Sequence, residues 1–314
     1  MSELPRLVVI LGPTASGKSE LGIRIAEQLG GEILVCDSTQ VYRHFDLGTA
    51  KVSPAGRRGI AHHLIDLVES GEVFTAGDYR RRAVEVLEDM RRRRKWPILT
   101  AGTGLYLRAL LEGLADAPTR SDELRERLRK RAARHGPEYL HRLLARLDPE
   151  TATRIAPRDT QKVVRAIEIR MLAGKGVADV HRGGRTGLQG YDIRKIGLLP
   201  ARAALYSRID ARVISMIEAG WLDEVRGLIA DGIPANVKPF QFIGYAELRA
   251  CLQGSLGQDA AIKRIQQSTR QFAKRQITWF RREKHVEWLA GFGHQPSIQS
   301  AALEIAQGPR STSS

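Results

Sequence analysis

The stretch Gly12-Pro-Thr-Ala-Ser-Gly-Lys-Ser19 constrains the fold of this chain more than any other segment. It directly follows the apolar run Leu7–Leu11, and a helical pattern runs from Ser19 to Leu29. A glycine-rich turn between a strand and a helix lets consecutive backbone N–H groups point at an anion, where the helix dipole also attracts negative charge. The pattern therefore predicts a strand, a phosphate-binding loop and a helix.

The residues of this loop have different expected roles. Lys18 would add a positive charge, and the hydroxyl of Ser19 is the candidate protein ligand for Mg²⁺. The residues expected to bind a diphosphate or triphosphate are Gly12, Pro13, Thr14, Ala15, Ser16, Gly17, Lys18 and Ser19. The motif alone leaves open which molecule carries the phosphates and whether a phosphoryl group is transferred.

The charge balance narrows the choice of partner. Lys and Arg outnumber Asp and Glu by 50 to 35, so the formal net charge is +15. Such an excess favours a polyanion, and we expect nucleic acid and not a membrane, because no apolar run approaches the roughly 20 residues of a membrane span. We expect a cytoplasmic protein. Cys36 and Cys251 lie far apart without metal-like spacing, so reduced thiols and no zinc site are expected.

Strand and helix patterns alternate in the first part of the chain and return near its end. The apolar β-type runs after Leu11 are Glu32–Cys36, His62–Leu67, Pro97–Ala101 and Ile193–Leu199. A helix from Thr75 to Arg94 lies between two of them, and further helices are expected after Ile193–Leu199. This alternation predicts an α/β fold: a parallel sheet like that of P-loop NTPases, with helices on both faces.

A different pattern separates the two parts of this core. Residues 119–172 show no strand signal, and their Arg-rich helical segments carry 14 Lys/Arg against 8 Asp/Glu. The glycine-rich stretch 174–190 is expected to be loop-like. We therefore expect core residues 1–118, an all-helical insertion over 119–190, core residues 191–306, and a disordered tail over 307–314.

Three side chains stand where open α/β sheets hold ligands. Asp37 follows the second strand, and its carboxylate could accept a proton or help to hold Mg²⁺, or could serve only as a turn or helix cap. Asp66 is a rival, because Leu-Ile-Asp66 resembles the end of a Walker B strand. Thr103 lies in a glycine turn before a helix, where it could face the same ligand or cap the helix.

The predicted helix over residues 259–282 is strongly basic. Residues 263–285 hold 8 Lys/Arg and one acid, Glu283. Such a run is commonly a solvated face, but here Phe272, Trp279 and Phe280 interleave with the cations. That mixture suits phosphate contacts combined with base stacking, so nucleic-acid contact is the favoured interpretation.

The residues together resemble those of the bacterial tRNA dimethylallyltransferases, also called tRNA isopentenyltransferases. The resemblance extends to about Trp288, and the order and spacing of the matching segments are highly specific. The segments that carry it are Gly12–Ser19, Asp37–Arg43, Gly48–Lys51, His62–Asp66, Gly102–Tyr106, Gln161–Glu168, Ile243–Tyr245 and Arg270–Arg281. Two departures are Thr100-Ala101-Gly102, where Val-Gly-Gly is common, and Phe240-Gln-Phe before Ile-Gly-Tyr.

The resemblance implies an activity. In this family a dimethylallyl group passes from dimethylallyl diphosphate to N6 of the adenosine on the 3′ side of the anticodon, tRNA position 37, in tRNAs that read codons beginning with U. Mg²⁺ would be the cofactor, and the prenyl diphosphate and the tRNA anticodon stem-loop would be the partners. Asp37 would accept a hydrogen bond or proton from N6, Thr103 would lie near the donor diphosphate, and we expect a monomer.

The resemblance also implies RNA contacts across several segments. The residues concerned are Asp37, Ser38, Thr39, Gln40, Arg125, Gln161, Lys162, Val163, Val164, Arg165, Phe240, Gln241, Phe242, Ile243, Gly244, Tyr245, Lys274, Arg275, Gln276, Ile277, Thr278, Trp279, Phe280 and Arg281. Arg208 and Arg212 are candidate diphosphate ligands, with solvated helix arginines as the alternative. A small-molecule or nucleoside kinase and an RNA-binding NTPase share the loop and sheet, but a kinase leaves the basic helix unexplained.

Overall fold

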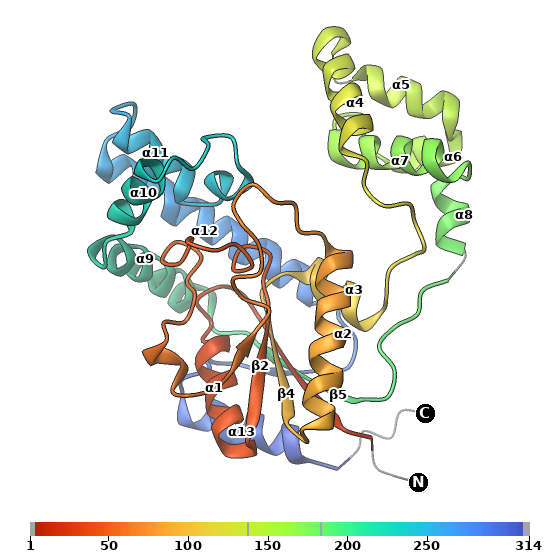
Figure 1. The fold of residues 1–314 in the computed structure, drawn as a ribbon. Coiled ribbons are helices and arrows are strands. Elements are labelled where there is room, and N and C mark those ends of the chain that lie inside the picture. The colour runs from red at the N-terminus through yellow and green to blue at the C-terminus, as the bar shows by residue number, and fades with distance from the viewer. Residues whose placement is uncertain (1–3, 137, 183, 310–314) are drawn as a thin grey trace. The chain divides into compact units, whose positions relative to one another are not determined.

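The computed structural model describes residues 4–136, 138–182 and 184–309 (Figure 1). Its chain forms two compact units: Leu111–Gly187 is the smaller, and the rest of the described chain is the larger. The expected insertion, 119–190, overlaps the smaller unit. Of the expected disordered tail, Gln307 ends a helix and residues 310–314 lie outside the described part.

The larger unit contains a six-stranded sheet in which every neighbouring pair is parallel. Its order is β3-β2-β4-β1-β5-β6. The strands are β1 (Arg6–Leu11), β2 (Gly31–Cys36), β3 (His62–His63), β4 (Trp96–Ala101), β5 (Asp192–Leu198) and β6 (Val286–Leu289). The predicted α/β parallel sheet is confirmed, whereas β6 is an addition and β3 is much shorter than the predicted strand.

Strand register brings the predicted site segments to one edge of the sheet. Ala101 of β4 pairs with Leu11 of β1 on one side and with Cys36 of β2 on the other. The residues that follow these strands, Gly12, Gly102 and Asp37, therefore leave the sheet from the same row. Because β4 separates β1 from β2, Asp37 reaches the phosphate loop across the turn after β4, not from an adjacent strand.

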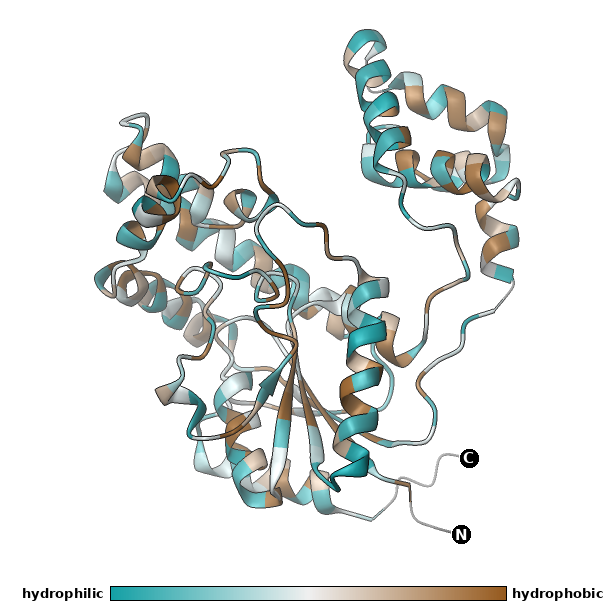
Figure 2. Ribbon diagram, in the orientation of Figure 1, coloured by the Kyte–Doolittle hydropathy of each residue, from teal (hydrophilic) through white to brown (hydrophobic). Residues whose placement is uncertain are grey.

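Helices cover both faces of this sheet. Helices α1 (Lys18–Leu29) and α13 (Pro296–Gln307) pack on one face, in a core that includes Val8, Ile10 and Ile98. Side chains alternate along a strand, so Leu7, Val9 and Leu11 point to the opposite face. There α2 (Ala76–Arg92) packs against β4, and Figures 1 and 2 show it across the sheet from α1, with the strands largely apolar.

The larger unit has seven further helices in its described part. They are α3 (Gly104–Leu111), η1 (Ala55–Arg57), α9 (Arg202–Glu218), α10 (Trp221–Ala230), η2 (Lys238–Gln241), α11 (Tyr245–Leu252) and α12 (Gln258–Phe280). The predicted basic helix is confirmed as α12, which packs against α9 and α11. None of the helices in the described part is both long and apolar enough to cross a membrane.

The smaller unit is built of short helices around its own apolar core. They are α4 (Asp122–His135), α5 (Glu138–Leu147), α6 (Pro149–Arg154), α7 (Thr160–Ala173) and α8 (Val177–Arg182). Leu124, Leu140, Leu144 and Ile167 form part of the core. Helix α8 corrects the expectation of a loop throughout 174–190, since Gly174 ends α7 and a further helical turn follows it.

Candidate active site

A cavity of about 1050 Å³ lies at the carboxyl edge of the sheet, wholly within the larger unit. Open α/β sheets bind their ligands at this edge. Its walls come from the loop after β1, the segment after β2, the turn after β4, and helices α9 and α12. The predicted site residues that line it are Thr14, Ala15, Gly17, Lys18, Ser19, Asp37, Ser38, Thr39, Gln40, Thr103, Arg208, Arg212, Gln241, Phe242, Ile243, Arg275, Gln276, Trp279 and Phe280.

The loop after β1 has the backbone of a phosphate-binding turn. Ala15 and Gly17 are in the left-handed region, with φ of 62° and 90°. Gly17 is the N-cap of α1 and no side chain caps it, so the first turn presents its N–H groups to the cavity. A Cβ at Gly17 would lie 2.8 Å from the backbone nitrogen of Gly293, which also donates to the carbonyl of Ser16 at 2.9 Å.

Three cations from two elements surround this loop. Lys18 donates to the carbonyl of Pro13 at 2.8 Å. Burial lowers the pKa of Lys18 to about 8; the charge of Arg212 lowers it further, and the charge of Asp37 acts in the opposite direction. Burial and then Arg208 lower the pKa of Arg212, which points at the Thr14 hydroxyl at 3.5 Å. None of the three cations forms an ion pair with a carboxylate of the described residues, so the cavity favours an anion.

Residues outside the predicted motifs hold one of these cations. Arg208 donates to His294 Nδ1 at 2.6 Å, and its guanidinium lies 4.9 Å from the centre of the Phe292 ring. His294 and Phe292 follow β6, so the same segment that supports the loop at Gly293 also positions Arg208. Sequence reasoning missed this segment because no motif marks it.

Asp37 is held in one orientation at the cavity wall. Its Oδ1 accepts from the Thr39 backbone N–H at 2.9 Å and from the Thr39 hydroxyl at 2.7 Å. Its Oδ2 lies against Gly102, where a Cβ would be only 2.4 Å away. Asp37 thus makes the turn contact expected of a simple cap, and it also faces the cavity that the phosphate loop lines.

Thr103 ties the turn after β4 to the segment after β2. Its hydroxyl accepts from the Ser38 N–H at 2.9 Å and donates to the Ser38 hydroxyl at 3.2 Å. The N–H groups of Gly102 and Thr103 both donate to the carbonyl of Cys36, at 3.0 and 2.9 Å. Asp37, Ser38, Gly102 and Thr103 therefore form one rigid block at the cavity wall.

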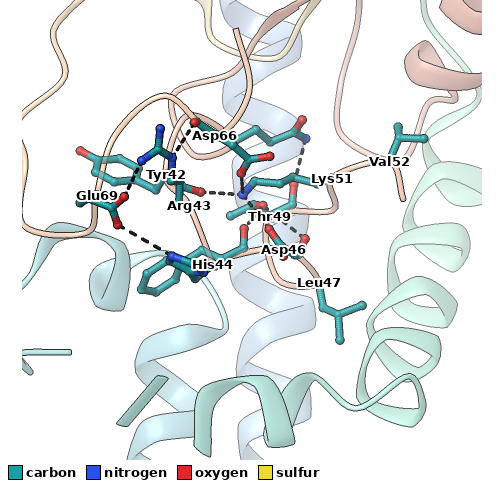
Figure 3. A network of polar contacts seen from close by, with 12 residues as sticks. Tyr42, Arg43, His44, Asp46, Leu47, Thr49, Lys51, Val52, Asp66 and Glu69 are labelled. Atoms are coloured by element: carbon teal, nitrogen blue, oxygen red, sulfur yellow. Dashed lines mark hydrogen bonds and ion pairs between the residues drawn. The ribbon is translucent and has the colours of Figure 1, made fainter. Parts of the chain in front are cut away.

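A buried lysine organises the neighbouring wall (Figure 3). The Lys51 ammonium donates to the carbonyl of Tyr42 at 2.6 Å, to Asp46 Oδ1 at 2.7 Å and to Asp66 Oδ1 at 2.5 Å. All three of its N–H groups are used, so Lys51 holds the loop after β2 against the segment after β3. Asp66 is engaged by this lysine beside the edge strand β3 and is not among the residues that line the cavity.

Several of the predicted RNA contacts on the larger unit have buried side chains. The side chains of Phe240, Tyr245, Gln276 and Phe280 are buried. Tyr245, for example, donates to Glu224 Oε1 at 2.6 Å, and Gly244 has no room for a Cβ beside the Trp221 ring. Phe240 and Tyr245 do not line the cavity, whereas Gln276 and Phe280 contribute to its wall.

Other members of the same segments remain accessible. Gln241, Lys274, Arg275, Thr278 and Arg281 are exposed. Phe242, Ile243, Ile277 and Trp279 are half-buried, and Trp279 lies beneath the Arg108 guanidinium at 4.8 Å. Of these residues, Phe242, Arg275 and Trp279 give the cavity two aromatic side chains and a cation at its wall.

A buried carboxylate organises the helical unit. Glu168 is fully buried and accepts from Arg125 Nε and Nη2 at 2.9 and 2.7 Å, from Arg165 Nη1 at 2.7 Å and from the Ser121 N–H at 2.8 Å. Burial alone would raise the pKa of Glu168, but these bonds hold it at about 2. Arg125 and Arg165 are therefore primarily structural partners of this carboxylate.

The other predicted contacts of the helical unit differ in exposure. Val163 and Val164 are buried in its core. Gln161 and Lys162 are exposed at the start of α7.

The described residues contain no cluster of three or more His, Cys, Asp or Glu side chains that could hold a metal ion. Ser19 is exposed in the first turn of α1 and lines the cavity. Mg²⁺ keeps several waters and binds substrate phosphates through one or two protein groups. The residues present therefore fit a metal ion that arrives with a phosphorylated substrate.

A parallel sheet with a glycine-rich loop between its first strand and first helix, opening into a cationic cavity, defines a P-loop-like α/β protein. Residues 40–283 match the family model described as IPP transferase. The chain belongs to this family of enzymes. It is 49% identical over 298 residues to a tRNA dimethylallyltransferase of Solibacter usitatus, covering 95% of this chain and 97% of that protein.

Further relatives agree with this assignment. A tRNA dimethylallyltransferase of Geobacter metallireducens is 44% identical, covering 96% of this chain and 97% of that protein. The crystal structure of a tRNA isopentenylpyrophosphate transferase from Bacillus halodurans matches with a TM-score of 0.70 at 34% identity, covering 96% of this chain and 94% of that one. The structure of a eukaryotic dimethylallyltransferase acting on tRNA matches with a TM-score of 0.77 at 29% identity. The match covers 88% of this chain and 70% of that one.

Proposed function

We propose that this enzyme transfers the dimethylallyl group of dimethylallyl diphosphate to N6 of the adenosine on the 3′ side of the anticodon, in tRNAs that read codons beginning with U. The observation that carries the proposal is the placement of Lys18 and Arg212, which form no ion pair with a carboxylate in the described part of the chain, in the same cavity as the fixed carboxylate of Asp37. An anion site and a proton acceptor share one chamber, as group transfer from a diphosphate requires.

The diphosphate would lie in the loop Gly12–Ser19. The N–H groups at the start of α1 would bind its oxygens, together with Lys18 and Arg212 and with Arg208 at the outer side. Preorganised positive groups stabilise the charge that develops on a leaving group. Mg²⁺, held by Ser19 and water, would neutralise part of the same charge when bound.

The acceptor would be bound on the Asp37 side of the cavity. The N6 amine attacks the first carbon of the dimethylallyl group, and the bond between that carbon and the diphosphate oxygen breaks, with its electron pair leaving on the diphosphate. N6 then loses a proton, which the Asp37 carboxylate would accept. Thr103 keeps the Asp37 segment in place through Ser38.

An adenine in a stacked anticodon loop cannot reach this chamber. It must be extruded, at a cost of a few kcal/mol. The exposed Lys274, Arg275 and Arg281 are suited to RNA phosphates, and Trp279 and Phe242 to bases. On the helical unit, Gln161 and Lys162 are the exposed candidates for contact with the anticodon stem-loop.

Two parts of the proposal concern the protein as a whole. We infer a cytoplasmic enzyme, because its tRNA acceptor is made and used there. We propose that the enzyme acts as a monomer, since the residues assigned to the donor and to Asp37 all lie in one compact unit of the chain.

The test uses purified protein, dimethylallyl diphosphate, Mg²⁺ and unmodified tRNA that reads codons beginning with U. Mass spectrometry of the digested tRNA should show N6-dimethylallyl adenosine at the position after the anticodon. Asp37→Asn should lower turnover by about 10²- to 10⁴-fold, the typical contribution of a catalytic base, while tRNA binding stays within about tenfold. Consumption of ATP with a small acceptor and no tRNA product would instead support the kinase alternative.

A further inference from the structure

Gln276 joins two segments that are far apart in the sequence. It lies in α12, its side chain is buried, and its Oε1 accepts from the Thr14 N–H at 2.7 Å. Its Nε2 donates to the carbonyl of Gly102 at 2.8 Å. One side-chain amide thus bridges the loop after β1 and the turn after β4.

These two partners belong to the two halves of the candidate site. Thr14 is in the phosphate loop, and its hydroxyl faces Arg212. Gly102 lies against Asp37 Oδ2 and precedes Thr103. No other side chain among the described residues is recorded as bonding to both segments, so the Gln276 amide directly ties the donor side of the cavity to the acceptor side.

We infer that Gln276 is a positioning residue that sets the spacing between the donor loop and the Asp37 block. This inference rests on the proposed function, because it assigns the donor to the loop and the acceptor to Asp37. It also replaces the expectation that Gln276 contacts RNA, since the amide is directed at two protein backbone groups. The consequence is that Gln276 acts on the chemical step, through the geometry of the two reacting groups.

The expected size follows from how sensitive transfer is to geometry. A displacement of about 1 Å can lower a rate by about 10²-fold, even when the altered residue does not touch the reacting atoms. Without the amide, the Thr14 N–H and the Gly102 carbonyl lose their bond partner inside the protein, and both segments are free to shift.

The first variant is Gln276→Met, which keeps the length of the side chain and removes both polar groups. We expect kcat to fall about 10- to 100-fold at saturating donor and tRNA, with the KM for tRNA within about twofold of wild type. The matched control is Gln267→Met, at an exposed glutamine of the same helix, which should behave as wild type.

The second variant is Gln276→Glu, which tests the bond to the Thr14 N–H separately from the bond to the Gly102 carbonyl. An ionised carboxylate still accepts from Thr14 but repels the Gly102 carbonyl, whereas the protonated form can donate to it. Asp37, beside Gly102, favours the protonated form, while Lys18, Arg212 and Arg275 around the cavity favour the ionised one. Activity relative to wild type should therefore rise as the pH falls, and Gln276→Met should show no such rise.

A readout independent of the reaction keeps this inference distinct from the proposed function. Hydrogen exchange of the peptide that contains Thr14 should be faster in Gln276→Met than in wild type and in Gln267→Met, whether or not tRNA is prenylated. Wild-type kcat with unchanged exchange in Gln276→Met would overturn the inference. So would a loss confined to the KM for tRNA, which would return Gln276 to the RNA surface.

Discussion

Gly102 lies so close to Asp37 that a Cβ on residue 102 would be 2.4 Å from Asp37 Oδ2. Real Cβ atoms do not approach an oxygen this closely, so any other residue at 102 must displace the carboxylate or the turn. Because Asp37 Oδ1 is anchored on Thr39, the displacement falls first on Oδ2 of this cavity-lining carboxylate.

Gly102→Ala should therefore lower kcat about 10- to 100-fold, the range expected when a reacting group moves by about 1 Å. Donor and tRNA binding should change little, and steady-state kinetics with both substrates checks this. Gly71→Ala is the control, because a Cβ there meets nothing within 4 Å. A wild-type kcat in Gly102→Ala would mean that the orientation of Asp37 does not matter for the reaction.

Lys18 gives the free enzyme a distinctive pH dependence. Its pKa is lowered to about 8, mainly by burial, so its ammonium is charged below that pH and neutral above it. The kcat/KM for dimethylallyl diphosphate reports groups of the free enzyme, and it should fall about tenfold per pH unit above pH 8.

Lys18→Arg provides the comparison for this pH profile, because a guanidinium stays charged throughout the range. Its kcat/KM, although lower overall, should not show the fall above pH 8. A wild-type profile that stays flat to pH 9.5, or the same fall in the arginine variant, would remove Lys18 from the donor site.

Lys274 and Arg275 test the basic face of α12. Both are exposed, and each phosphate contact contributes about one unit to the slope of log K against log salt. Lys274→Ala/Arg275→Ala should weaken tRNA binding and reduce this slope by about two units. Lys95→Ala is the control, because Lys95 precedes β4 at the opposite edge of the sheet. An unchanged slope would make this part of α12 an ordinary solvated face.

Glu168 should dominate the stability of the helical unit. Removing one partner of a buried ion pair costs about 3–5 kcal/mol, so Glu168→Gln should unfold this unit at a lower denaturant concentration. Glu150→Gln, in an exposed pair with Arg154, should have little effect. Hydrogen exchange of peptides within residues 111–187 measures both variants.

The acid dependence of this unit has a definite sign. The pKa of Glu168 is about 2 in the folded state and 4.5 for the free side chain, so its stabilising contribution is complete above pH 4.5 and is lost as the pH falls toward 2. Glu168→Gln should lack that acid-sensitive component. Equal acid sensitivity of the two proteins would show that the carboxylate is not the cause.

Much of the fold follows from local pattern. The strands β1, β2, β4 and β5 have apolar runs between clear breaks, and Thr75 and Asp78 form the capping box that starts α2. The predicted strand His62–Leu67 is only two residues long in the structure, because Leu64 and Asp66 have positive φ. The β-propensities of these residues give no sign of that backbone conformation. Strand β6 was not predicted, since a four-residue run gives too little periodicity, and helix α13 was not predicted either.

The position of the phosphate loop and of Asp37 at the cavity was predictable, because both follow strands whose apolar runs are clear in the sequence. The site was not predictable where a tertiary partner decides the role. Arg125 and Arg165 look like RNA-binding cations until Glu168 is seen between them, and Gln276 looks like a surface amide until Thr14 and Gly102 are seen on either side. The sequence gives the chemical type of each of these side chains but not the groups that they contact.

The most direct test of the central claim uses dimethylallyl diphosphate labelled separately in its prenyl carbon and in its phosphate. With Mg²⁺ and unmodified tRNA, each diphosphate released should be matched by one prenyl group on tRNA, and both should be lost together in Asp37→Asn. Two results would contradict the assignment of the loop as the binding site of the diphosphate leaving group. One is release of diphosphate without prenyl transfer, and the other is tRNA-stimulated hydrolysis of ATP without prenyl transfer.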